Sequence, residues 1–118
     1  MTQVIEGLIR AASGLRDDAQ AIARRLESEG VADCVYNPLM YAWDVHEEFI
    51  RRSGGHGAKV ILLGMNPGPH GMGQMGVPFA ATSVVRDLLG ISRIEVGQPV
   101  SPHPNRPVNG LSHPKEEV

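Results

Sequence analysis

The feature that most constrains the fold is a short apolar run followed at once by a loop rich in glycine and proline. Residues 59–63, Lys-Val-Ile-Leu-Leu, are mostly branched and apolar, which is typical of a strand buried on both faces of a parallel sheet. The next stretch, 64–76, holds five glycines and two prolines, a composition that disfavours regular structure and lets backbone approach a ligand closely. Ligands of open α/β sheets bind where such strands end, so the functional site is expected here.

Helices are predicted on both sides of this segment. Apolar residues recur every three or four positions over 4–26, which predicts one long amphipathic helix with Gly30 suited to cap its end. A second helix is predicted over 44–52 and a third, short one over 84–89. The sequence therefore predicts an α/β fold, as part of a three-layer α/β/α sandwich with a parallel central sheet.

Composition limits the classes of function. The chain has 118 residues, enough for one small domain, and its formal net charge is -2 with a pI near 6.2. This balance excludes a protein that holds nucleic acid mainly through general positive charge, so any contact with DNA is expected to be local. The single cysteine, Cys34, excludes an internal disulfide and a cysteine-rich zinc site. No apolar run approaches the ~20 residues that span a bilayer, and the first residues lack the basic region of a signal peptide, so we expect a cytoplasmic protein without membrane contact.

The composition changes near residue 97. Five of the nine prolines follow Gly97, and few large apolar residues accompany them. Residues 1–96 are therefore predicted to be the globular part, and 97–118 a proline-rich connector that is extended or disordered.

Two common phosphate-binding motifs fit poorly. Residues 71–76 match G-x-G-x-x-G, but Pro67 and Pro69 separate them from the predicted strand and Pro78 follows, whereas a dinucleotide fingerprint passes directly from strand to helix. No Gly-Lys-Ser/Thr follows the strand, which excludes a P-loop. A nucleotide-binding protein that uses this glycine loop stays a weaker alternative.

The histidines show no metal-ligand spacing. His46-Glu47 lacks the second histidine of H-E-x-x-H, so we expect no metal. Cys34 is predicted to be an inert small side chain. Four of the five histidines are predicted to be solvated or capping residues, namely His46, His56, His103 and His113.

Three blocks of the sequence resemble one enzyme family. They are 36–43, then Gly-Met-Asn-Pro-Gly-Pro at 64–69 with 71–79, and finally 83–91 with 103–111. In this order they are similar to the single-strand-selective monofunctional uracil-DNA glycosylases. The resemblance implies base-excision repair, in which the N-glycosidic bond of a uracil on a flipped nucleotide is hydrolysed by water, without cofactor or metal. The partner it implies is uracil-containing DNA, single- or double-stranded.

The resemblance also implies roles for four residues. Asn66 matches the asparagine that orients the attacking water, and Phe79 matches the aromatic that stacks on the flipped base. Met65 matches a residue that lines the uracil pocket. Gly68 stands where other uracil glycosylases carry a tyrosine against C5 of the base, which implies that 5-substituted uracils such as 5-hydroxymethyluracil are also accepted. His70 departs from the aromatic residue common at its place.

Part of the family's machinery has no counterpart in these 118 residues. The asparagine that reads the uracil edge and the His-Pro-Ser-Pro histidine that stabilises the leaving anion are absent, and neither His103 nor His113 matches the latter. We therefore expect residues 1–96 to be the N-terminal part of a glycosylase domain. The chain alone is expected to be a monomer and to release little or no uracil. In a bacterium it would associate with the nucleoid, and in a eukaryote it would be nuclear. The alternative is a non-catalytic fragment or degenerate module that binds nucleic acid or a partner chain weakly.

Overall fold

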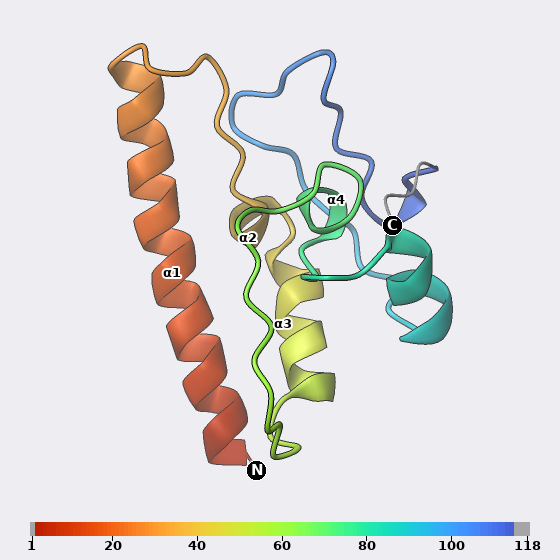
Figure 1. Ribbon diagram of the computed structural model, residues 1–118. Coiled ribbons are helices and arrows are strands. Elements are labelled where there is room, and N and C mark those ends of the chain that lie inside the picture. The colour runs from red at the N-terminus through yellow and green to blue at the C-terminus, as the bar shows by residue number, and fades with distance from the viewer. Residues whose placement is uncertain (1, 115–118) are drawn as a thin grey trace.

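The computed structural model describes residues 2–114 and consists of helices joined by long irregular segments (Figure 1). The elements, in chain order, are the helices α1 (Thr2–Ser28), α2 (Pro38–Tyr41), α3 (Trp43–Ser53) and α4 (Met72–Met75), the π-helical turn η1 (Val84–Leu88) and the 3-10 turn η2 (Gly110–Ser112).

The long helix predicted over 4–26 is confirmed as α1. It ends at Ser28 and is followed by a left-handed Gly30, whose φ is 71°, and the N–H of Val31 donates to the carbonyl of Leu26 at 3.0 Å. This arrangement satisfies carbonyls that the last turn of a helix leaves open. α1 lies along one side of the molecule and contacts α2 and α3, with an ion pair of 3.1 Å between Glu6 and Arg51 at one end (Figure 1).

The expectation of a parallel central sheet in an α/β/α sandwich is wrong. The part of the chain that the structure describes contains helices and no strand. The segment 59–63 is irregular, and none of its backbone groups pairs with another segment among residues 2–114. A strand is stabilised by neighbouring strands and by burial, and its own composition supplies neither. The apolar run therefore did not by itself specify a sheet.

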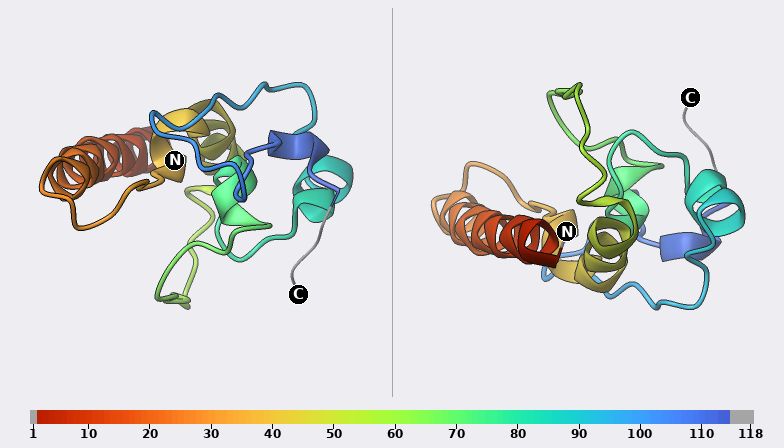
Figure 2. Two further views of the ribbon diagram at one scale, coloured as in Figure 1. Left: turned by 90° about the horizontal axis from the view of Figure 1, so that it is seen from above. Right: turned by 90° about the horizontal axis from the view of Figure 1, so that it is seen from below.

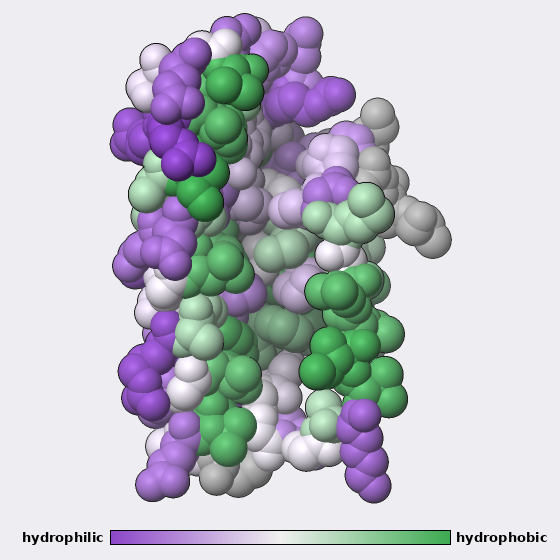
Figure 3. All heavy atoms as spheres, turned by 60° about the vertical axis from the view of Figure 1, so that its left-hand side comes forward, coloured by the Kyte–Doolittle hydropathy of each residue, from purple (hydrophilic) through white to green (hydrophobic). Residues whose placement is uncertain are grey.

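The same segment is highly exposed. Both views of Figure 2 show the chain after α3 looping away from the rest of the molecule, and the Ile61 and Leu63 side chains are 91% and 94% exposed. α1 also exposes apolar side chains, among them Leu15 and Ile22. Figure 3 shows the apolar face of α1 opposite a second apolar ridge, with a hollow between them. The apolar run expected in the core thus lies at the surface.

The core lies elsewhere, where α3, α4, η1 and η2 meet. Its fully or almost fully buried members are Val45, Met75, Val77, Val85, Ile91 and Leu111. A second cluster joins α2 to the C-terminal segment through Tyr41, Ala42 and Val108. The glycine-rich loop 64–76 is therefore anchored at its far end, by Met75, and exposed at its beginning.

The described part of the predicted connector, 97–114, runs back across α2 and α4 (Figure 1). The N–H of Gly97 donates to the carbonyl of Tyr41 at 2.8 Å, and the side chains of Val108 and Leu111 are buried. The last four positions of the connector, 115–118, lie outside the described residues. Within residues 2–114, no helix combines the length and the apolar character that crossing a bilayer requires.

Candidate active site

Met65 and Asn66 lie on the exposed side of the glycine-rich loop. Met65 is 100% exposed, and Asn66 is also exposed. The side-chain amide of Asn66 donates to the carbonyl of Pro67 over a long 3.4 Å, and no described residue donates to its Oδ1. The amide oxygen of Asn66 is therefore open to solvent and free to bind a water molecule.

Phe79 lies beside this motif although it is thirteen positions after Asn66 in the sequence. A Cβ atom placed on Gly64 would lie 3.1 Å from Cζ of Phe79, so the edge of the ring faces the backbone of Gly64. The ring is 67% exposed, and the φ of Phe79 is 57°, the left-handed region that side-chain-bearing residues rarely adopt. Strain of this kind is kept where the surrounding structure enforces it, often at functional sites.

Gly68 belongs to a tight turn that precedes α4. Its carbonyl accepts the N–H of Gly73 at 2.8 Å, and a Cβ atom placed on Gly73 would lie 2.7 Å from that oxygen. A Cβ atom on Gly71 would lie 2.8 Å from the carbonyl oxygen of Ala80. Both approaches are closer than a side chain permits, so the loop requires glycine at 71 and 73 for packing. The expectation that 64–76 has no regular structure is wrong for the four residues of α4.

Gln74 holds the loop against the C-terminal segment. Its side chain is almost fully buried, and its Nε2 donates to the carbonyls of Pro69 at 3.0 Å and Pro107 at 2.9 Å. Its Oε1 accepts the N–H of Asn109 at 2.6 Å. One amide thus satisfies three backbone groups from two segments, which fixes their relative position.

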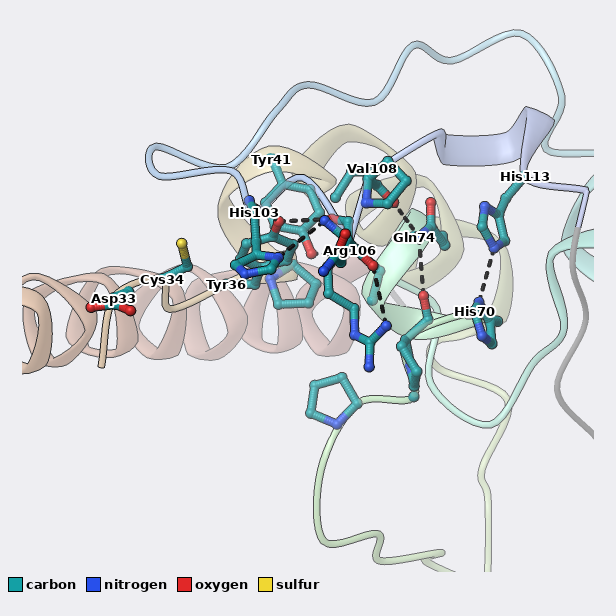
Figure 4. Close-up of a pocket in the computed structure, with 17 residues that line it drawn as sticks. Asp33, Cys34, Tyr36, Tyr41, His70, Gln74, His103, Arg106, Val108 and His113 are labelled. Carbon is teal, nitrogen blue, oxygen red and sulfur yellow. Dashed lines mark hydrogen bonds between the residues drawn. The ribbon is translucent and has the colours of Figure 1, made fainter. Parts of the chain in front are cut away.

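A cavity of about 730 Å³ lies between the glycine-rich loop, the C-terminal segment and the stretch that follows α1, residues 33–38 (Figure 4). Pro67 and Gly68 line it on the loop side, whereas Met65, Asn66 and Phe79 are not among its lining residues. The half-buried Cys34 lines it near the end of α1. Of the four residues that the sequence singled out, only Gly68 therefore lines the cavity.

Two tyrosines form the cavity wall on the side of α2. Tyr36 and Tyr41 meet edge to face with ring centroids 6.1 Å apart, and the hydroxyl of Tyr41 donates to the carbonyl of Gly73 at 2.6 Å. Burial, and to a lesser degree the neighbouring Tyr36, raise the pKa of the Tyr41 phenol well above its ordinary value. Tyr41 is therefore a neutral hydrogen-bond donor that anchors the loop.

A chain of hydrogen bonds joins two histidines at the other end of the cavity. Nδ1 of His70 lies 3.0 Å from Nε2 of His113 (Figure 4). Nδ1 of His113 lies 3.0 Å from the side-chain amide of Asn109. The ring centroids of the two histidines are 5.2 Å apart, so the rings meet through their nitrogens and not through their faces. His113 was expected to be solvated or capping; it is 7% exposed and therefore not solvated, and it follows η2 as its capping residue, with its N–H donating to the carbonyl of Gly110 at 3.1 Å.

The other histidines also have local partners. A ring nitrogen of His46 lies 2.8 Å from the carbonyl of Gly76, and one of His56 lies 3.1 Å from the carbonyl of Arg52. Residues 2–114 bring no three His, Cys, Asp or Glu side chains together as a metal site would require.

Three mammalian proteins resemble this chain, each named as a single-strand selective monofunctional uracil-DNA glycosylase. The chain is 43% identical over 113 residues to the Bos taurus protein, an alignment that covers 96% of this chain and 40% of that protein. Its identity is 50% to the Rattus norvegicus protein and 49% to the Mus musculus protein, in each case over 84 residues, which cover 71% of this chain and 30% of the relative. The chain belongs to this family. It matches no protein-family profile.

Membership of the uracil-DNA glycosylase family is thus established for a chain that spans 40% of its bovine relative and 30% of its rodent ones. In the structure Met65, Asn66 and Phe79 are all exposed, Phe79 lies against Gly64 at the start of the motif, and Gly68 lines the cavity. Sequence reasoning gave no role to Gln74, a polar residue between a glycine and an apolar residue, because nothing in its local pattern marks a buried amide. It also gave none to Tyr36 and Tyr41, although both lie within the first family-like block.

Proposed function

We propose that the protein containing this chain hydrolyses the N-glycosidic bond of uracil in DNA. The observation that carries the proposal is the identity of 43% and 50% to proteins named for that activity, over stretches that include the loop 64–76 and Phe79. The open face of the loop is consistent with it, because a base that is swung out of a DNA strand needs an accessible site.

Asn66 is proposed to position the attacking water. Cleavage of the bond between base and sugar leaves a cation-like sugar and an anionic uracil, so the water needs orientation more than a strong base. The exposed Oδ1 of Asn66 can accept a hydrogen bond from such a water, and the 3.4 Å contact from its amide to Pro67 favours one orientation of the side chain.

Phe79, Met65 and Gly68 are proposed to contact the base. The exposed ring of Phe79 offers a face for stacking, which is worth ~1 to 3 kcal/mol per base, and its left-handed backbone holds it beside the motif. Met65 is proposed to line the pocket. Gly68, which carries no side chain, is proposed to leave room for substituents at C5, so that 5-hydroxymethyluracil is also a substrate.

The proposed partner is uracil-containing DNA, single- or double-stranded, bound by a monomer without cofactor or metal. The formal charge of -2 gives the chain no general affinity for phosphate, so recognition is proposed to be local to the loop and its surroundings. The proposed location follows the DNA, which is the nucleoid in a bacterium and the nucleus in a eukaryote.

The test is single-turnover excision of uracil from a single-stranded oligonucleotide by the full polypeptide that contains this sequence. Asn66→Ala is expected to slow excision at least about 100-fold and to leave oligonucleotide binding nearly unchanged. Gln3→Ala is the matched control: it removes an exposed side-chain amide on α1, outside the loop, and should change neither excision nor binding. Near-normal excision by Asn66→Ala would contradict the assigned role. Binding without any excision by the unmodified protein would favour the alternative of a non-catalytic module.

A further inference from the structure

Of the four residues with a proposed role, only Gly68 lines the cavity of about 730 Å³, so those roles leave most of its wall unexplained. The walls of the cavity are formed by residues 33–38 after α1, by the loop 67–74 and by the segment 103–113 (Figure 4). Its volume lies within the range of small-molecule sites, roughly 300 to 1,000 Å³. Pro67 and Gly68, the two residues that follow Asn66, line it.

One arginine is presented to this cavity by a rigid turn. The hydroxyl of Tyr36 donates to the carbonyl of Arg106 at 2.7 Å and accepts the N–H of His103 at 2.7 Å. The N–H of Arg106 donates to the carbonyl of His103 at 3.0 Å, and Nδ1 of His103 accepts the N–H of Asn105 at 3.1 Å. These four bonds fix the backbone from which the arginine side chain projects.

The guanidinium of Arg106 makes fewer hydrogen bonds than the turn from which it projects. Its Nη1 donates to the carbonyl of Asn105 at 3.1 Å, and within residues 2–114 no carboxylate forms an ion pair with it. The side chain is exposed and points from its turn toward the glycine-rich loop (Figure 4). Several N–H groups with fixed geometry are therefore available, and such a fork matches the oxygens of a phosphate.

Part of the remaining wall suits a flat apolar group, because seven of its residues are prolines, tyrosines and a valine, namely Pro38, Pro67, Pro69, Pro107, Tyr36, Tyr41 and Val108. Asp33 is the one carboxylate of the lining; it lies on the side of α1, away from Arg106, and within residues 2–114 it forms no ion pair with it (Figure 4). A recess of this kind with one guanidinium at its edge fits a ligand that carries a planar ring and a single negative charge. A nucleotide has both features.

We propose that this cavity binds the nucleotide of single-stranded DNA adjacent to the one whose base is removed, with its phosphate on Arg106. The inference rests on the proposed function, since it takes Asn66 as the reacting position. A strand that reaches Asn66 continues along the loop, and the next residues of the loop, Pro67 and Gly68, line the cavity. The site would add a local phosphate contact to a chain of net negative charge.

The experiment measures binding of the full polypeptide to single-stranded oligonucleotides that carry one uracil, with fluorescence anisotropy at several salt concentrations. Arg106→Gln is expected to weaken binding about tenfold and to reduce the salt slope by about 0.7, the value for one phosphate of a single strand. Arg10→Gln, which removes an exposed charge from α1, is the matched control and should leave both quantities unchanged. Thermal melting of each variant confirms that it is folded.

A second arm identifies the contacted phosphate. A neutral methylphosphonate is placed in turn at each phosphate flanking the uracil, and one position is expected to weaken binding as much as Arg106→Gln does and to have no further effect in that variant. Independent, additive effects at every position would overturn the proposal, as would equal behaviour of Arg106→Gln and Arg10→Gln. Competition by free dTMP as strong as by the oligonucleotide would replace DNA with a free nucleotide as the ligand. The proposed function fails separately, when Asn66→Ala excises uracil normally.

Discussion

Oε1 of Gln74 accepts the backbone N–H of Asn109 at 2.6 Å, a bond that joins α4 to a segment 35 residues further along the chain. Gln74→Met keeps the size of the side chain but leaves this N–H and the carbonyls of Pro69 and Pro107 without their partner. We expect the free energy of unfolding to fall by about 3 kcal/mol, because buried backbone groups without a partner are costly. Urea denaturation measures the change.

Gln98→Met is the control for this prediction. Gln98 is exposed and makes one comparable bond, from Nε2 to the carbonyl of Val108 at 2.9 Å, so its loss should cost about 1 kcal/mol or less. Equal losses in the two variants would show that Gln74 does not join the two segments as described.

Substitution by alanine should change the stability of the fold in opposite directions at two glycines, Gly73 in the loop and Gly14 in α1. Gly73→Ala is expected to destabilise by at least about 2 kcal/mol, because its Cβ would lie 2.7 Å from the carbonyl oxygen of Gly68 and neither backbone can move freely. Gly14→Ala in α1 should stabilise by about 0.5 to 1 kcal/mol, because nothing lies within 4 Å of its Cβ and alanine favours a helix. Thermal melting compares them, and the same sign for both would contradict the packing of the loop.

Local pattern predicted the two longer helices, α1 and α3, but not the short α2 and α4, and its prediction of a buried strand over 59–63 was wrong. The periodicity of α1 and the left-handed Gly30 after it are properties of short stretches, so the sequence reveals them directly. Burial of Val60 and its neighbours depends on segments that would have to lie on both sides, and residues 2–114 supply none. Apolar composition alone therefore does not distinguish a buried strand from an exposed irregular segment.

For the candidate site too, the sequence predicted individual residues but not the long-range contacts around them. The family-like motif predicted Asn66 and Phe79 as site residues, and in the structure the ring of Phe79 lies against Gly64. The cavity walls come from three segments of the chain, and the bonds that shape them, such as Tyr36 to Arg106, span 70 residues. No local signal encodes a contact at that separation, so a structure was needed to find it.

The stability of the fold should fall at alkaline pH through Tyr41. Its folded-state pKa is raised above the ordinary value of 10.0 because burial disfavours the phenolate. The unfolded chain therefore releases this proton first, so the stabilisation is complete below pH 10 and is lost as the pH rises from there through the folded-state value.

Tyr41→Phe tests this pH dependence. The variant should be about 1 kcal/mol less stable at neutral pH, since the bond to the carbonyl of Gly73 is lost, and its stability should fall less steeply above pH 10. Urea denaturation over this range gives the slope, and ultraviolet absorbance of tyrosinate follows ionisation of the folded protein. An unchanged slope in the variant would place the alkaline transition in another group.

The last prediction separates strain from packing at Phe79. Its φ of 57° costs a residue with a side chain ~1 to 2 kcal/mol, and its ring is 67% exposed, so the ring adds little burial. Phe79→Ala keeps the strain and is expected to change stability by less than about 1 kcal/mol, whereas Phe79→Gly relieves the strain and should be about 1 kcal/mol more stable than Phe79→Ala. Met75→Ala, in the fully buried core, should cost about 2 to 5 kcal/mol by comparison.

DNA binding tests the stacking role of Phe79 separately from its effect on stability, because Phe79→Gly and Phe79→Ala both remove the ring. Under the proposed function both variants should lose affinity for uracil-containing DNA to the same extent, about fivefold or more, although they differ in stability. Chemical denaturation and oligonucleotide titration of the two variants measure the two quantities independently. If affinity instead followed stability, with Phe79→Gly binding better than Phe79→Ala, the ring would act through the shape of the loop and not by stacking on a base.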